Sequence, residues 1–103
     1  MGSLKQEIRN ETERGIIVQT LVDWCLEWVP FREVRLQLMR SAGYPVDVEK
    51  VNYHLNYLQQ NGYAEVRVLR PARVGLELTT VRATPKAVDL VEGRIAPDPG
   101  VAL

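Results

Sequence analysis

The sequence has one cysteine, one histidine and no long hydrophobic run. A single cysteine, Cys25, cannot form a disulfide within the chain, which fits a reducing cytoplasm. Cys25 and His54 cannot by themselves supply the clustered ligands of a metal-sensing site, so we expect no metal ion and no cofactor. No apolar stretch approaches the ~20 residues that span a bilayer, and the polar first residues are not those of a signal peptide. We therefore expect a protein that does not insert into membranes.

The sequence also shows no recognisable catalytic set. It has no Ser/His/Asp or Cys/His arrangement, no glycine-rich phosphate loop and no pair of carboxylates marked out for acid–base work. An enzyme needs a nucleophile or an acid–base pair together with a group that orients it. We therefore expect a binding protein and not an enzyme.

A basic excess is missing too, because 13 Lys and Arg residues balance 13 Asp and Glu residues. Proteins that bind nucleic acids usually carry a basic excess, since phosphate contacts supply much of their affinity. The charges are nevertheless segregated along the chain: acids gather early (Glu7, Glu11, Glu13, Asp23, Glu27), and arginines gather late (Arg67, Arg70, Arg73, Arg82). A neutral protein with such a basic region can still bind DNA.

The stretch from Pro45 to Tyr63 carries the clearest pattern in the chain. Asp47 suits the N-cap of a helix, and Gly62 suits the left-handed residue that ends one. Apolar residues with helical spacing are expected to form its buried face: Val48, Val51, Leu55 and Leu58. The opposite face is polar and mostly uncharged: Lys50, Asn52, Tyr53, Asn56, Tyr57 and Gln60. An ordinary surface helix has the same pattern, but these side chains also suit hydrogen bonding to base edges.

An earlier helix is predicted from about Leu4 to Trp28, and it carries two apolar stripes. One stripe is Ile17, Leu21, Trp24 and Trp28, and the other is Val18, Val22, Cys25 and Val29. A surface helix of a small domain needs one such stripe, so the first could form a homodimer interface. The alternative, that both stripes are buried under other helices of the same domain, is equally open. Cys25 is expected to be a buried filler.

Pro30 should end that helix and open a short second one, with Phe31, Val34 and Leu38 inside and Arg32, Arg35 and Arg40 outside. Gly43 and Pro45 then stop it before Asp47. A short helix, a tight connection and a capped helix follow one another, which is the order of a helix-turn-helix.

After Gly62 the apolar period changes to two. Alternating residues over 64–69 and 76–81, joined by a turn with Pro71 and Gly75, predict a β-hairpin. Thr84 and Pro85 are suited to begin a last short helix, which Gly93 should end. The remaining residues are rich in Pro and Gly and are expected to be frayed or draped on the surface.

The run VNYHLNYLQQNGYAEVR resembles the recognition helix and first wing strand of bacterial regulators of the ArsR, MarR and PadR groups. The run LTTVRATPKAVDLVEG is similar to their second wing strand and the helix that follows. A looser similarity is to small winged-helix proteins of Mu-like prophages. The resemblance covers about residues 12–93 and implies an α+β, mainly α, winged helix-turn-helix fold, with three helices, a two-stranded wing and a short C-terminal helix. We expect this domain to span residues 1–93 and to be followed by an irregular tail over 94–103.

Carried over residue by residue, the resemblance implies a set of DNA contacts. The recognition helix, about 47–61, would place Asn52, Tyr53, His54 and Asn56 in the major groove. Lys50 and Arg35 would touch phosphates, and Arg70 and Arg73 at the tip of the wing, about 64–83, would reach the backbone or minor groove. Tyr57 stands where these groups usually have an aliphatic residue, so partial burial is expected there.

Two functions follow as hypotheses. The first is a homodimeric, sequence-specific transcriptional regulator that binds double-stranded DNA, with no membrane partner and with any small-molecule effector unknown. The alternative is a winged-helix module that binds protein and not DNA. Such a module could be derived from a phage. Zero net charge would permit the second. Dependence of DNA binding on salt separates the two.

Overall fold

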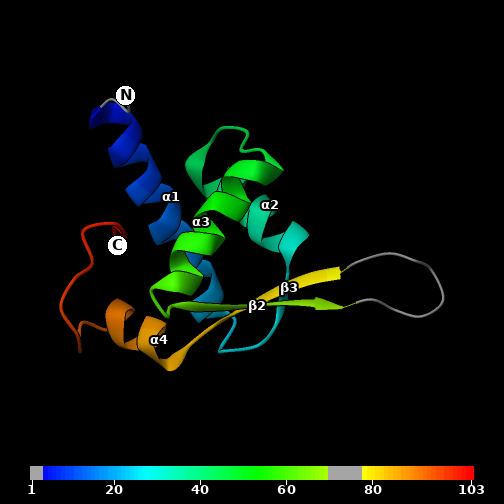
Figure 1. The fold of residues 1–103 in the computed structure, drawn as a ribbon. Helices are drawn as coiled ribbons and strands as arrows, with labels where there is room; N and C mark the ends of the chain where they lie inside the picture. The colour runs from blue at the N-terminus through cyan, green and yellow to red at the C-terminus, as the bar shows by residue number, and fades with distance from the viewer. Residues whose placement is uncertain (1–3, 70–77) are drawn as a thin grey trace.

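The computed structural model describes residues 4–69 and 78–103 (Figure 1). In these residues the helices are α1 (Leu4–Asp23), α2 (Phe31–Ala42), α3 (Val48–Gln60) and α4 (Pro85–Val91), and the strands are β1 (Val29–Pro30), β2 (Ala64–Leu69) and β3 (Leu78–Ala83). The strands form one antiparallel sheet in the order β1-β3-β2. The α+β, mainly helical, winged helix-turn-helix architecture predicted from the sequence is confirmed.

The end of α1 differs from the prediction. The helix stops at Asp23, and Cys25 and Leu26 both adopt left-handed backbone angles, with φ of 55° and 64°. These two residues turn the chain so that Val29 can pair with Val81 on β3. Pro30 is therefore the last residue of β1 and the N-cap of α2, and it does not break a helix. Cys25 is exposed, and the expectation of a buried filler was wrong.

The core lies between the helices and the inner face of the sheet. Its fully buried apolar side chains come from α1, β1, α2, α3 and β3: Ile17, Val18, Leu21, Val29, Val34, Leu38, Val51, Leu58 and Val81. Gly43 ends α2 with a φ of 81°, and its N–H donates to the Met39 carbonyl over 2.9 Å. Thr84 caps α4 through its hydroxyl, and Pro85 follows at the first helical position, as the sequence predicted. None of the helices in the described ranges is both long and apolar enough to cross a membrane.

The two faces of the sheet have different roles. On the inner face Val66 lies opposite Val81 and Ala64 opposite Ala83, which joins β2 and β3 to the core. The outer face carries Arg67 and Arg82, and their guanidinium carbons lie 4.1 Å and 4.6 Å from the ring centroid of Trp28. Since an arginine over an indole face is attracted to it, this contact ties the α1–β1 connection to the wing.

The C-terminal tail, residues 94–103, has no helix or strand but is packed against α1 and α3 (Figure 1). Val101 is 5% exposed and belongs to the core. The Ala102 N–H donates to the Glu11 carbonyl over 3.0 Å. The tail crosses α1 at Gly15, where an added Cβ would lie 1.7 Å from the Ala102 carbonyl oxygen. The tail is therefore draped on the helices by specific contacts and is not frayed.

Candidate nucleic-acid interface

Helix α3 begins and ends where its sequence predicts. The Asp47 Oδ1 atom accepts the Lys50 N–H over 2.8 Å, which caps the first turn. Gly62 has a φ of 80°, and the Tyr63 N–H donates to the Leu58 carbonyl over 2.8 Å. A left-handed glycine followed by this local hydrogen bond satisfies a carbonyl of the last turn of the helix. Both ends of α3 are thus determined by short-range contacts.

The buried side of α3 is rotated relative to the prediction. Val51, His54, Leu55 and Leu58 face the core, whereas Val48 is 47% exposed. The spacing 51-54-55-58 is the spacing of one helical face, so His54 occupies the inward position that was assigned to Val48. The prediction that Val48 is buried was wrong.

The outward side of α3 is open to solvent. Its exposed residues are Val48, Glu49, Asn52, Tyr53, Asn56, Gln59 and Gln60. We call Val48, Glu49, Asn52, Asn56 and Gln59 the amide face, because amides dominate it and these residues form one continuous arc of the helix. Lys50 is the single cation of α3, and it is half-buried with its Nζ 5.1 Å from the Tyr53 ring centroid. The amide face therefore carries hydrogen-bonding groups and no positive charge.

His54 does not face a groove. It is fully buried, and its Nε2 lies 2.7 Å from the Oε1 atom of Glu13, which is 2% exposed. The Tyr44 hydroxyl donates to the other carboxylate oxygen, Oε2, over 2.5 Å. The predicted DNA contact through His54 was wrong, because α3 turns this side chain toward the carboxylate of α1.

Burial keeps the His54 imidazole neutral. Removal from water lowers the pKa of His54, and the opposing hydrogen bond and charge of Glu13 do not outweigh it. The Nδ1 atom is buried without a partner, so protonation would create a second buried N–H with nothing to accept it. A neutral His54 ring that donates from Nε2 gives its one N–H a hydrogen-bond acceptor in the Glu13 carboxylate. Burial, together with the Glu13 hydrogen bond, raises the pKa of Tyr44 to about 12.

The tail covers the other edge of α3. Tyr57 is half-buried, as expected, and its hydroxyl donates to Asp98 Oδ1 over 3.0 Å, while the Tyr63 hydroxyl donates to Oδ2 over 2.8 Å. Burial by itself would raise the pKa of Asp98, but hydrogen bonds from the Gly100 N–H and from both tyrosines lower it overall. Arg14 lies 4.0 Å above the Tyr57 ring and donates to the Gly100 carbonyl. The exposed surface of α3 thus consists of the amide face, Tyr53 and Gln60.

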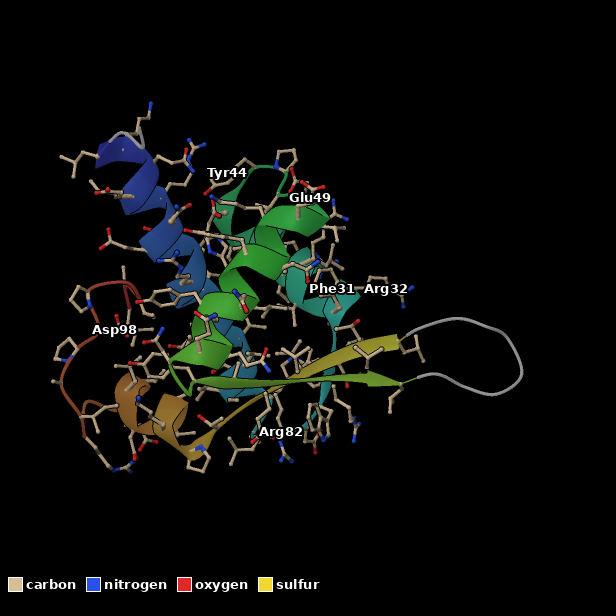
Figure 2. The ribbon with its side chains drawn as sticks, viewed as in Figure 1. Phe31, Arg32, Tyr44, Glu49, Arg82 and Asp98 are labelled. Carbon is tan, nitrogen blue, oxygen red and sulfur yellow. The ribbon has the colours of Figure 1, made fainter. Side chains whose placement is uncertain are left out.

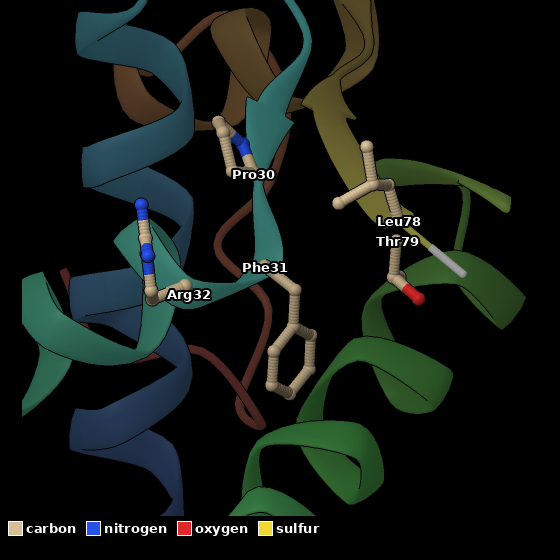
Figure 3. A pocket seen from close by; sticks show the side chains of 5 residues that line it. All are labelled: Pro30, Phe31, Arg32, Leu78 and Thr79. Atoms are coloured by element: carbon tan, nitrogen blue, oxygen red, sulfur yellow. The ribbon is translucent and has the colours of Figure 1, made fainter. Parts of the chain in front are cut away.

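The arginines of α2 lie beside α3. Arg35, a predicted phosphate contact, donates from Nε to the Val46 carbonyl over 2.7 Å and so holds the turn between α2 and α3. Arg32 is exposed and lines a hollow of about 430 Å³ with Pro30, Phe31, Leu78 and Thr79 (Figure 3). Figure 2 shows Arg32 and Glu49 on the side of the helices toward which the wing extends. Arg32 is therefore an exposed cation at the edge of this surface.

The wing tip falls outside the described residues. Arg70 and Arg73, both predicted DNA contacts, lie in that part, so their contacts stay predictions. In the described part of the wing, Arg82 pairs with Glu65 over 3.0 Å, and it shares the Trp28 ring with Arg67. These two arginines stabilise the sheet.

The predicted dimer stripe does not form a surface. Ile17 and Leu21 are fully buried in the core of their own chain. Trp24 is 38% exposed in the turn after α1, and Trp28 is half-buried beneath the arginines of the wing. The prediction of this stripe as a dimer interface was wrong. Helix α1 ends before both tryptophans, so they do not lie on the helical face that carries Ile17 and Leu21.

Sequence reasoning missed Glu13, Tyr44 and Asp98. Glu13 stands four residues before Ile17, so helical spacing places it on the buried stripe of α1. A lone acid on an apolar stripe is a signal for a buried polar partner. Nothing local in the sequence marks Tyr44 or Asp98, because both find their partners through tertiary packing.

Comparisons with known proteins give one informative likeness. No family model matches the chain, and no curated protein matches it. The crystal structure of a protein from Thermoplasma acidophilum described as a putative transcriptional regulator superposes with a TM-score of 0.65 at 14% sequence identity. The match covers 79% of this chain and 72% of that chain. At this identity the likeness shows the fold alone: the two proteins share the same α+β, mainly helical fold.

Proposed function

We propose that this protein is a sequence-specific DNA-binding transcriptional regulator, with α3 in the major groove and the wing along the backbone. The observation that carries the proposal is the open amide face, where Asn52, Asn56 and Gln59 lie exposed on the capped second helix of a helix-turn-helix. Such a helix fits the width of the major groove, and its side chains can then reach base edges. The described solved structure with the same fold is named as a regulator, which agrees with this role.

Phosphate contacts are proposed to come from the elements around α3. Arg32 and Arg40 are exposed on α2, and Lys50 is half-buried at the start of α3. Arg70 and Arg73 of the wing add two positive charges by sequence. A local cluster of this kind supplies the electrostatic part of DNA affinity even though the whole chain is neutral.

Salt dependence tests the proposal. Binding of the full chain to fluorescent duplex DNA, followed by anisotropy, should weaken steeply between about 50 mM and 200 mM salt. Arg32→Ala should weaken binding to all sequences alike and reduce the slope of log affinity against log salt by about one. The double variant Arg70→Ala/Arg73→Ala should reduce that slope by about two if both contact phosphates.

Arg94→Ala is the matched control. Arg94 is exposed after α4, where it pairs with Asp89 and Glu92, and its loss should leave both affinity and slope unchanged. A protein that shifts no duplex DNA at about 50 mM salt would overturn the proposal. That result would support the alternative, a winged-helix module that binds protein, which the zero net charge permits.

We further propose that the regulator acts as a homodimer. The amide face of one α3 spans only a few base pairs, and helix-turn-helix proteins commonly double their site by two-fold symmetry. Leu4 and Ile8 are 72% and 54% exposed one turn apart on α1, and they replace the buried stripe as candidate dimer contacts. Light scattering at micromolar concentration should give the mass of two chains. A monomer, alone and on DNA, would remove the homodimer.

A further inference from the structure

The amide face limits which base pairs α3 can recognise, and this inference rests on the proposed function. The face offers three amides (Asn52, Asn56 and Gln59), one carboxylate (Glu49) and one branched apolar side chain (Val48). All five are exposed, and within the described part of the chain their side chains make no hydrogen bond to other residues. The types of side chain present and absent can therefore be compared directly with the pattern of each base pair.

Guanine is the base that this face is least equipped to bind. Its major-groove edge shows two acceptors, N7 and O6, and the usual partner is a bidentate Arg or Lys. The amide face has neither, and Lys50 points instead to the Tyr53 ring beside α1. Glu49 can only accept hydrogen bonds when ionised, so its carboxylate would be repelled by both guanine acceptors.

Adenine and thymine fit the same face. An Asn or Gln amide can donate to adenine N7 and accept from adenine N6 at the same time. Val48 is 47% exposed at the first turn of α3, the part of a recognition helix that enters the groove. Its methyl groups offer the apolar contact that the thymine C5-methyl group needs. Glu49 can accept from an amino group, on adenine N6 or cytosine N4.

We propose that α3 recognises a half-site rich in A·T pairs, with the Asn52 and Asn56 amides on adenines and Val48 against a thymine methyl group. Specificity on this view comes from α3 and not from the arginines, because the cations surround the amide face without belonging to it. Base pairs that only the wing contacts should keep the same base preference when residues of the amide face are replaced.

Selection from a random duplex pool at about 50 mM salt tests the proposal first. The bound fragments should be enriched in A·T pairs at adjacent positions. Anisotropy on the selected duplex then measures single contacts. Asn52→Ala should lose about 10-fold in affinity for this duplex and almost nothing for a G·C-rich duplex of the same length. Gln19→Ala, which removes an exposed amide from α1, is the matched control and should change neither.

Modified bases separate the individual roles. Replacing adenine by 7-deazaadenine removes the N7 acceptor, and affinity should fall about 10-fold for the native chain but not for the Asn52→Ala variant. Replacing thymine by uracil removes the C5-methyl group, and the resulting loss should disappear in Val48→Ala. Asn52→Arg should move the preference toward guanine.

The outcomes distinguish the two proposals. A chain that binds no duplex overturns the proposed function itself. A chain that binds DNA but selects G·C-rich sites, or that is indifferent to 7-deazaadenine and to Asn52→Ala, overturns the A·T inference alone and leaves a DNA-binding protein whose specificity lies elsewhere.

Discussion

Replacing Glu13 by alanine is expected to lower the free energy of unfolding by about 3 kcal/mol, which corresponds to a drop in Tm of roughly 10–20 °C. The carboxylate of Glu13 accepts from His54 Nε2 and from the Tyr44 hydroxyl. Tyr44 can turn to water when this acceptor is lost, but His54 is fully buried and cannot. The variant therefore leaves a buried N–H unpaired as well as a small cavity. Urea and thermal unfolding followed by circular dichroism measure the loss.

Glu7→Ala is the control for this prediction. Glu7 is an exposed acid on the same helix, so its replacement should change stability by less than about 0.5 kcal/mol. If the two variants unfold alike, the Glu13–His54 contact contributes nothing in solution and the account of the buried pair fails.

The same pair predicts a pH dependence. The folded pKa of His54 is lowered from 6.5, so below that pH the unfolded chain binds a proton that the folded chain does not. Stability should therefore decrease as the pH falls through about 6.5 and continue to decrease down to the folded pKa. His54→Gln, whose amide can still donate to Glu13, should remove this component. Denaturation midpoints at pH 7.5 and 5.5 provide the comparison.

Replacing Gly15 by alanine is also expected to cost about 3 kcal/mol, through the tail. The new Cβ would lie 1.7 Å from the Ala102 carbonyl oxygen and 2.7 Å from its carbon, and the backbone of neither segment can yield that far in place. The tail must leave α1. Val101 then loses its burial, and Asp98 loses the hydroxyl groups of Tyr57 and Tyr63.

A shortened chain that ends after Arg94 tests whether the contact between the tail and α1 causes the loss of stability in Gly15→Ala. Without the tail, Gly15 lies in the interior of a helix with nothing above it, and alanine is preferred to glycine there by about 1 kcal/mol. Gly15→Ala should therefore stabilise the shortened chain and destabilise the full one. A stabilising effect in both would show that the tail does not lie on α1 in solution.

Local signals in the sequence were enough for the elements that carry the candidate site. Asp47 and Gly62 mark both ends of α3, and Thr84 with Pro85 marks the start of α4, because caps depend on groups within one turn of the chain. The change of apolar period after Gly62 identified the strands of the wing, because alternation along a strand is also a pattern of near neighbours in the sequence. The exposure of Asn52 and Asn56 also followed from helical spacing.

The contacts that decide which other residues reach the site required the tertiary structure. Strand β1 is two residues long and exists through its pairing with Val81 and Thr80, so no local pattern could show it or the early end of α1 that it requires. Because the sequence analysis extended this helix to about Trp28, it placed Trp24 and Trp28 on a helical face that does not exist.

By itself, the sequence determined the order of the elements, the caps of α3 and the polar character of its exposed side. Only the tertiary structure decided that His54 turns inward to Glu13 and that Asp98 fastens the tail along one edge of α3. The physical reason is distance along the chain. Caps and periodicity involve neighbours within a few residues, whereas a buried hydrogen bond needs a partner that packing brings from another element.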